Sequence, residues 1–416
     1  MEKLQHIEII VLLLQLATML VVARIFAEIA RSLKQPAVVG EILAGVLLGP
    51  TLFGTIAPDY FFMLFPPSGS SAMVLDGFIQ VAVVLLLFIA GLEVDLHIVW
   101  QQGRQALLVS LFSMILPFGL GFLASYFMPG LFNIADGDRI IFALFIGTIL
   151  SVTALPVIAR ILMDLGIFKT NIGMLIIASA MIIDILAWLV FSVILSLMGS
   201  EGEKMNIQTT IGLTLGFTLF MLTVGRWLIN FSLPWINKKL SWPGGLLSLS
   251  LALCFAAAAF TEYIGIHAIF GAFIIGVALG DSEHLSERAK EIIHQFINNI
   301  FAPLFFVSIG LYINVFESFV LLPILVLLIT AYVGKIGGAT LGARLGRLPK
   351  YDALAVGFGM NTHGTLEVIL AAIALNNEII SEEIFVSVLV VVMITILTSA
   401  PLMKYCLKLA KEKETG

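Results

Sequence analysis

Residues 178–188 read ASAMIIDILAW, and this stretch decides the fold class because it sets one acid group, Asp184, inside a long apolar run. The predicted helix extends from residue 170 to residue 198, and at about 1.5 Å per residue it is long enough to cross a hydrocarbon layer about 30 Å thick. An ionisable side chain at that depth is costly, so it is a candidate site residue by default. The stretch therefore predicts a membrane-spanning helix with a functional carboxylate near its middle.

The rest of the chain has the same apolar character. Of its 416 residues 60% are hydrophobic and 12% are charged, with a mean hydropathy of +1.09, whereas soluble domains carry about 25% charged residues. The composition predicts an all-α polytopic membrane protein. A hydropathy window of about 19 residues places 13 transmembrane helices, at 9–30, 36–54, 72–95, 105–128, 139–163, 170–198, 207–229, 244–263, 266–280, 291–315, 319–343, 351–375 and 383–407.

The loops between these helices predict the orientation. Of the 22 Lys and Arg residues, 17 fall in one set of alternate loops and 3 in the other set. Basic residues accumulate in short loops on the cytoplasmic side of a membrane. We expect the N-terminus outside, the C-terminus in the cytoplasm and a first helix that is not cleaved. The longest connections, 55–71 and 230–243, leave no room for a soluble regulatory domain. The net charge of -5 argues against a nucleic-acid partner.

Lys335 is the second ionisable residue at mid-membrane depth, in the run AYVGKIGGA at 331–339. The nearer end of its predicted helix is about 12 Å away, which is too far for the side chain to reach water. The ammonium group therefore needs an internal partner or a cavity. Asp184 and Lys335 could alternatively form a purely structural salt bridge, although a well-packed apolar pair would often be as stable.

Two predicted helices are interrupted close to these charges. The fifth contains SVTALP at 151–156, where Pro156 removes a backbone donor, and the twelfth contains GFGMNTHGT at 357–365, which is polar and rich in glycine. Broken backbone at membrane depth is tolerated only inside protein or beside water. The free carbonyls and half-helix ends at such breaks are suited to binding ions.

The order of these features predicts internal symmetry. Helices four to six carry a break and then Asp184, and helices eleven to thirteen carry Lys335 and then a break. The offset of seven helices, an odd number, makes the second triplet run opposite to the first. This pattern is typical of the inverted repeats of secondary transporters, with two discontinuous crossing helices and a binding site at the midplane.

Six motifs follow one another along the chain. They are QPAVVGEILAG at 35–45 with Gly49-Pro50, FIAGLEVD at 88–95, SVTALPV at 151–157, Asp184, FFVSIG at 305–310 and Lys335. In these motifs and in their order, the chain resembles the monovalent cation/proton antiporter superfamily along nearly its whole length, most closely the Kef- and NapA-like branch.

The resemblance implies an NhaA/NapA-like antiporter fold and a secondary active transporter rather than an enzyme. It implies exchange of Na⁺ or K⁺ for H⁺ without a cofactor, for pH homeostasis in a prokaryotic inner membrane. It also implies a homodimer in the lipid bilayer, with an interface part at about 1–100 and 244–315. The core part, at about 105–198 and 319–407, would carry the cation by an elevator-like movement.

Asp184 is the predicted shared site, because one carboxylate can hold a proton or a cation but not readily both. Thr153 and Ser151 offer hydroxyl or carbonyl oxygens to a Na⁺ or K⁺ ion bound at Asp184, or they alternatively bond only their own helix. Glu93 is either a third oxygen source or a carboxylate at the cytoplasmic edge.

The remaining candidates support the core. Lys335, Asn361, Thr362 and His363 are predicted to stabilise the core or to couple its movements, and Pro156 and Gly364 mark the two breaks. His363 is either a pH sensor or a hydrogen-bonded packing residue. Glu41 and Glu367 are interpreted as internal ion-pair or helix-end partners, and Arg24 and Glu28 as a pair within one helix.

The chain departs from the family pattern in three ways. A polar residue usually precedes the aspartate, and here it is Ile183; Arg or Lys usually stands where this chain has His363. Because Ile183 cannot titrate, we expect electroneutral exchange of one cation for one proton. The nucleotide-binding domain of Kef-type proteins is also missing, so regulation of that kind would need a separate subunit.

Other functions are compatible with parts of this pattern. A channel-like or uniport pathway for monovalent cations, of the Kef type, would show cation flux without proton flux. An organic-anion carrier of related inverted-repeat build would need a wider cavity than one Asp requires. An intramembrane aspartyl protease needs two catalytic Asp residues, and only Asp184 lies at mid-membrane.

Overall fold

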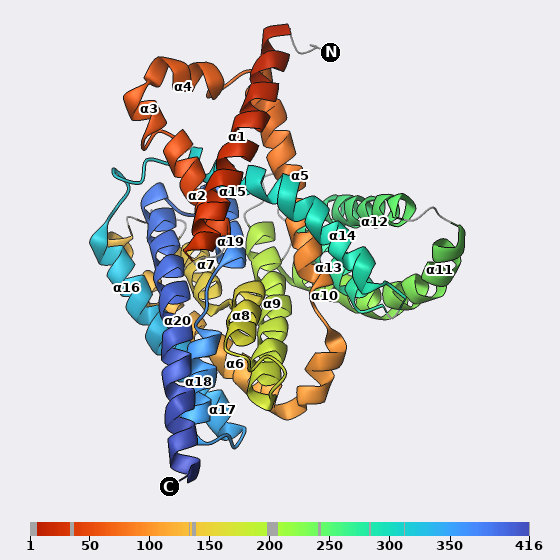
Figure 1. Cartoon of the computed structure of the whole chain (residues 1–416), viewed down its shortest axis with the longest axis vertical. Helices are drawn as coiled ribbons and strands as arrows, with labels where there is room; N and C mark the ends of the chain where they lie inside the picture. The colour runs from red at the N-terminus through yellow and green to blue at the C-terminus, as the bar shows by residue number, and fades with distance from the viewer. Residues whose placement is uncertain are drawn as a thin grey trace. The chain divides into compact units, whose positions relative to one another are not determined.

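The computed structural model describes residues 6–33, 37–132, 134, 139–197, 207–239, 243–282, 284–311 and 313–415. In these ranges its regular secondary structure consists of helices, with no strand (Figure 1). The chain divides into two compact units. The first unit comprises Met1–Val94 and Glu203–Ser318, and the second comprises Asp95–Gly202 and Phe319–Gly416.

The first unit is a bundle of apolar helices joined by short connections. It contains α1 (His6–Ser32), α2 (Ala37–Leu48), α3 (Phe53–Ile56), α4 (Pro58–Leu64), α5 (Ser70–Leu92), α10 (Ile207–Phe220), η2 (Met221–Gly225), α11 (Arg226–Lys239), α12 (Gly244–Tyr263), α13 (Ala268–Gly280), α14 (Glu287–Phe296), η3 (Ile297–Phe301) and α15 (Ala302–Leu311). The segments η2 and η3 are single π-helical turns that continue the helices on either side of them.

The second unit carries both mid-membrane charges. It contains α6 (Leu96–Phe127), η1 (Pro129–Leu131), α7 (Arg139–Ser151), α8 (Leu155–Asp164), α9 (Asn171–Leu197), α16 (Leu321–Ala331), η4 (Tyr332–Ile336), α17 (Gly337–Leu345), α18 (Lys350–Met360), α19 (Thr365–Asn376) and α20 (Glu382–Thr415). Figure 1 shows α20, in dark blue, running beside α16 and α18, which both contact it.

Ten helical stretches in the described residues are long and apolar enough to cross a membrane, and each coincides with a predicted span. The chain is therefore an integral multi-pass membrane protein. The other three predicted spans contain the shorter apolar helices Arg139–Ser151, Ala268–Gly280 and Leu366–Asn376. Because none of the three reaches the length of about 20 residues that a crossing needs, the count of 13 crossings stays a prediction.

Two predicted connections were wrong in part. The stretch 55–71 contains α4 and the end of α3, and the stretch 230–243 is helical as far as Lys239. In the second case a π-helical turn at 221–225 lets α10 continue directly into α11. A hydropathy window misses this continuation, because α11 mixes polar and apolar residues and ends in two lysines.

Several predicted helix ends also differ. The fourth helix begins at Leu96 instead of 105, and a kink at Gly103 (φ 50°, ψ -127°) separates its first turns from the rest. The last helix continues past 407 to Thr415, because its polar end is still a good helix-forming sequence. The predicted start at 36 and the predicted end at 198 lie outside the described residues.

Close backbone contact holds α5 and α13 together in the first unit. A Cβ atom on Gly91 of α5 would overlap the backbone of Phe273 and lie 2.9 Å from the amide nitrogen of Val277, both on α13. A Cβ on Gly276 would overlap the backbone of α5 in the same way. Membrane helices associate through such small residues because lipid supplies no hydrophobic drive between them.

This contact predicts different results for two glycines of the same helix. Gly91→Ala should lower the free energy of unfolding by about 1–3 kcal/mol through overpacking, whereas Gly77→Ala meets no atom within 4 Å and should be neutral or slightly stabilising. Thermal unfolding of both variants in detergent tests this. Equal melting temperatures for the two variants would contradict the packing described for α5 and α13.

Candidate functional site

The two interrupted segments of the second unit meet at their breaks. Residues 152–154 separate α7 from α8, and residues 361–364 separate α18 from α19. The amide of Ala154 donates to the carbonyl of Thr362 at 2.8 Å, and Oγ1 of Thr153 donates to the carbonyl of Met360 at 2.9 Å. The backbone groups that a continuous helix would pair internally are thus partly paired across the two breaks.

The residues predicted to break the helices occupy this junction. Pro156 is in the first turn of α8, where a proline leaves no helical hydrogen bond unmade. Gly364 immediately precedes α19, and a Cβ atom on it would lie 2.7 Å from the Cβ of Ala154. Only glycine therefore allows the two breaks to approach this closely.

The half-helix ends at the junction carry opposite partial charges, and each meets a side chain of the other sign. At the carboxyl end of α7, Nζ of Lys335 donates to the carbonyl oxygen of Ser151. At the amino end of α19, Oε2 of Glu367 accepts from the amide of Gly364 at 2.7 Å. Lys335 and Glu367 are both fully buried, so these two contacts stabilise helix ends that water does not reach.

The charges of two buried acid groups, Glu367 and Asp184, act on the ammonium group of Lys335. Asp184, in the interior of α9, is 2% exposed. The ammonium group predicted to need an internal partner thus has one in the carbonyl of Ser151, and two buried carboxylates act on its charge.

Close packing fixes the position of Lys335. It lies in η4, a π-helical turn within the continuous α16–α17 helix, and such turns are frequent at functional sites. On either side of it, a Cβ on Gly334 would overlap Pro117 of α6, and a Cβ on Gly338 would overlap the backbone of Phe112. The helix therefore lies directly against α6, with little freedom to shift.

Comparison with known proteins identifies the family of the chain. The family model described as "Sodium/hydrogen exchanger, transmembrane" matches residues 16–404. The chain belongs to the sodium/hydrogen exchanger family. It is thereby a member of the monovalent cation/proton antiporter superfamily, while its place in the Kef- and NapA-like branch stays a prediction.

Individual relatives agree with the family assignment. The Na(+)/H(+) antiporter NhaS4 of Synechocystis is 32% identical over 94% of this chain and 96% of its own length. The K(+)/H(+) antiporter 1 of Saccharomyces cerevisiae is 30% identical over 89% of this chain and 43% of its own. The chain spans about half the length of the Arabidopsis cation/H(+) antiporters that it matches.

A solved structure shares the fold. The sodium proton antiporter MjNhaP1 from Methanocaldococcus jannaschii aligns with a TM-score of 0.65, covering 95% of this chain and 96% of its own, at 16% sequence identity. At that identity the similarity supports the fold of this exchanger-family chain alone.

The hydroxyl groups of the two predicted cation ligands, Ser151 and Thr153, have different hydrogen-bond partners. The Ser151 hydroxyl donates to the carbonyl of Thr148 at 2.7 Å, and the carbonyl of Ser151 accepts from Lys335. The hydroxyl of Thr153 donates across the junction to the carbonyl of Met360. Both residues lie at the break, as predicted, and their role as ligands stays a prediction.

Glu93 belongs to the first unit, whereas Asp184 belongs to the second. It caps the carboxyl end of α5, and its Oε1 atom lies 3.8 Å from Nδ1 of His294. Its predicted role as a cation ligand is not tested by this position. Elsewhere in the first unit, Arg24 and Glu28 form the predicted pair within α1, at 2.8 Å.

The predicted coupling residues between α18 and α19 are buried at the junction. Nδ1 of His363 lies 3.3 Å from the carbonyl of Asn361, and that carbonyl also accepts from Ser399 of α20 at 3.3 Å. The hydroxyl of Thr362 donates to the carbonyl of Gly359 at 2.8 Å. These contacts hold the break in one conformation.

Glu367 is the residue whose importance the sequence understated. The sequence predicts only an ion-pair or helix-end partner, whereas in the structure Glu367 both accepts from the amide of Gly364 and acts with its charge on Lys335. Its spacing was the available signal, because an acid residue three positions after a helix break is placed to cap the new helix.

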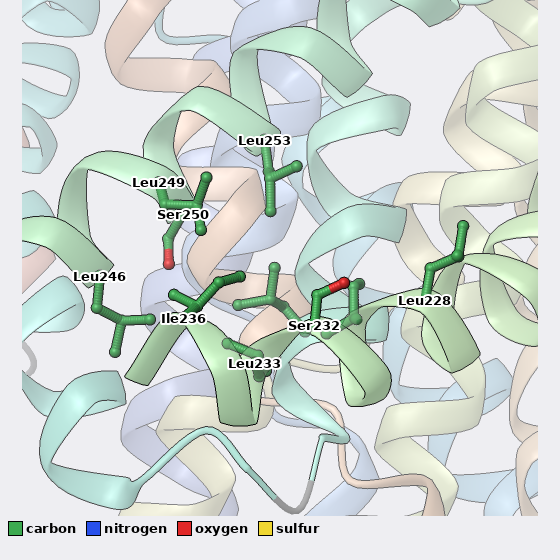
Figure 2. Close-up of a pocket in the computed structure, with 10 residues that line it drawn as sticks. Leu228, Ser232, Leu233, Ile236, Leu246, Leu249, Ser250 and Leu253 are labelled. Atoms are coloured by element: carbon green, nitrogen blue, oxygen red, sulfur yellow. The ribbon is translucent and has the colours of Figure 1, made fainter. Parts of the chain in front are cut away.

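A pocket of about 220 Å³ in the first unit is unsuited to a cation. Figure 2 shows leucine and isoleucine side chains of α11 and α12 around it, and among the described lining residues only Ser232 and Ser250 have side-chain oxygens. No carboxylate is among its lining residues. The candidate site is therefore the junction in the second unit.

Proposed function

We propose that this chain exchanges Na⁺ or K⁺ for H⁺ across the membrane, with Asp184 as the site that the cation and the proton share. The observation that carries the proposal is a nearly fully buried carboxylate in the same unit as two hydrogen-bonded helix breaks and a buried lysine. The names of the relatives, which include Na⁺/H⁺ and K⁺/H⁺ antiporters, support the class of ions.

The chemistry follows from competition at one group. Ionised Asp184 attracts a monovalent cation, and oxygens of Thr153 and Ser151 would complete its coordination. Protonated Asp184 has no charge to hold the cation, so protonation releases the cation. Exchange results if Asp184 is exposed to one side of the membrane at a time.

Alternating exposure would come from movement of one part of the molecule against another. We propose that the second unit, which carries Asp184 and the junction, is the transport core, and that the first unit is the scaffold of a homodimer. Residues 207–239, which lie outside both predicted parts, belong to the first unit. The proposal also includes an elevator-like movement of the second unit. It places 13 crossings in a prokaryotic inner membrane, with the N-terminus outside and the C-terminus in the cytoplasm.

Cation-induced proton flux in proteoliposomes, measured ion by ion, tests the proposed function. Na⁺ or K⁺ should change the internal pH of vesicles that contain the protein and leave protein-free vesicles unchanged. Cation flux without proton flux would instead support a uniport pathway, and flux of an organic anion would support a carrier. The absence of proton flux and of cation flux with every ion tested would contradict the proposal.

The exchange should be electroneutral. Ile183 precedes Asp184 and cannot titrate, so one carboxylate alternately carries one proton or one cation, and the same charge moves in both directions. A potassium/valinomycin potential imposed on Na⁺-loaded liposomes should leave the exchange equilibrium unchanged. A clear dependence on that potential would mean that a second proton crosses, and Lys335 would be its carrier.

A further inference from the structure

A small cavity lies beside the junction in the second unit. Its free volume, counted as the space open to the centre of a water molecule, is about 10 Å³. Its walls are aliphatic side chains of α7, α16 and α20. Among the lining side chains that the structure describes, His363 and Glu367 are the polar ones. Every lining residue is at most 5% exposed, so the cavity is in the interior of the unit.

Each of the two polar residues has one buried atom without a hydrogen-bond partner among the described residues. These atoms are Nε2 of His363 and Oε1 of Glu367. The other polar atoms of both side chains are used, since Nδ1 lies 3.3 Å from the carbonyl of Asn361 and Oε2 accepts from Gly364. The backbone of Leu150 also acts on the imidazole, but it makes no hydrogen bond to Nε2. Two unpaired polar atoms on residues that line one cavity are unusual, because buried polar groups are nearly always paired.

We propose that one water molecule occupies this cavity and bridges His363 to Glu367. The room matches a single water, and a buried water needs at least two polar partners. The contact with the Asn361 carbonyl requires a proton on Nδ1, which leaves Nε2 of a neutral imidazole as an acceptor. The water therefore donates one hydrogen to Nε2 and the other to Oε1.

This bridge makes His363 a positioning residue for cation binding, an inference that rests on the proposed function. A hydrogen bond donated to Oε1 stabilises the ionised form of Glu367, whose charge acts on Lys335 as that of Asp184 does. As long as Glu367 is ionised, it neutralises Lys335 and leaves Asp184 available to a cation. Without the bridge, Lys335 interacts more strongly with Asp184 and competes with the cation.

Four variants, measured as cation-driven proton flux in proteoliposomes at one pH, test the bridge. His363→Leu should raise the KM for the cation about tenfold, the effect of one lost hydrogen bond to a charged group, with little change in the maximal rate. His363→Gln, which can still bind the water, should restore the wild-type KM. Val391→Ile fills the cavity without touching a polar group and should raise the KM as His363→Leu does. In a Glu367→Gln background, His363→Leu should have no further effect on KM.

The outcomes separate the two proposals. An unchanged KM in both His363→Leu and Val391→Ile, or an equal effect of His363→Leu with and without Glu367, overturns the water bridge. If His363→Leu does not fold, Val391→Ile and His363→Gln decide the question. Wild-type protein that shows no exchange would instead overturn the proposed function, before any variant is compared.

Discussion

Asp184→Asn abolishes cation-driven proton movement if Asp184 is the shared site. The amide keeps the size and shape of the carboxylate, but it neither takes up a proton in this pH range nor carries the charge that holds a cation. Flux in proteoliposomes should fall to the level of protein-free vesicles with every cation tested. Asp59→Asn, the same change at an exposed residue of α4, should leave the flux unchanged.

The loss should not come from unfolding. In the variant, Lys335 still donates to the carbonyl of Ser151 and still faces Glu367, so no buried charge is left without a partner. The elution volume and the helical circular dichroism signal should match those of the wild type. A folded Asp184→Asn protein that keeps a substantial part of the wild-type flux would show that the site is elsewhere.

Lys335→Ala should have the largest effect on stability. The change leaves the carbonyl of Ser151 without its donor, removes the positive charge on which two buried carboxylates act and opens a cavity in a fully buried position. Removing one partner of a buried ionic group costs about 3–5 kcal/mol. Thermal unfolding in detergent should therefore show a large fall in melting temperature, and transport should fall as well.

A matched lysine of the same unit provides the control. Lys408 forms a pair with Glu412 at 3.7 Å on the exposed end of α20, and exposed pairs contribute at most about 1 kcal/mol. Lys408→Ala should melt close to the wild type. Unchanged melting together with unchanged transport in Lys335→Ala would leave Lys335 without the role described for it.

The sequence predicts the positions of the helices well, because hydropathy and length decide them. All 13 predicted segments contain a helix, and the breaks at SVTALP and GFGMNTHGT fall between helices as expected. Both breaks have local causes, since proline and glycine act on their own turn of backbone. These features could be predicted without knowledge of any partner.

The features that could not be predicted depend on tertiary contacts. The π-helical turn at Lys335 leaves no pattern in the composition. Hydropathy also does not reveal which carboxylates act on the charge of Lys335. The sequence offers Asp184 as a possible partner of Lys335 and Glu367 as an internal ion-pair residue, and in the structure the charges of both act on Lys335. The cavity between His363 and Glu367 depends on how three helices pack around the junction.

The central claim is that cation and proton compete for Asp184, and proton release on cation binding tests it most directly. Na⁺ or K⁺ would be added to the purified protein in weakly buffered solution, with bound cation and released protons measured together. The account predicts one proton released for each cation bound, and neither binding nor release in Asp184→Asn. Cation binding without proton release, or equal release in Asp184→Asn, would contradict it.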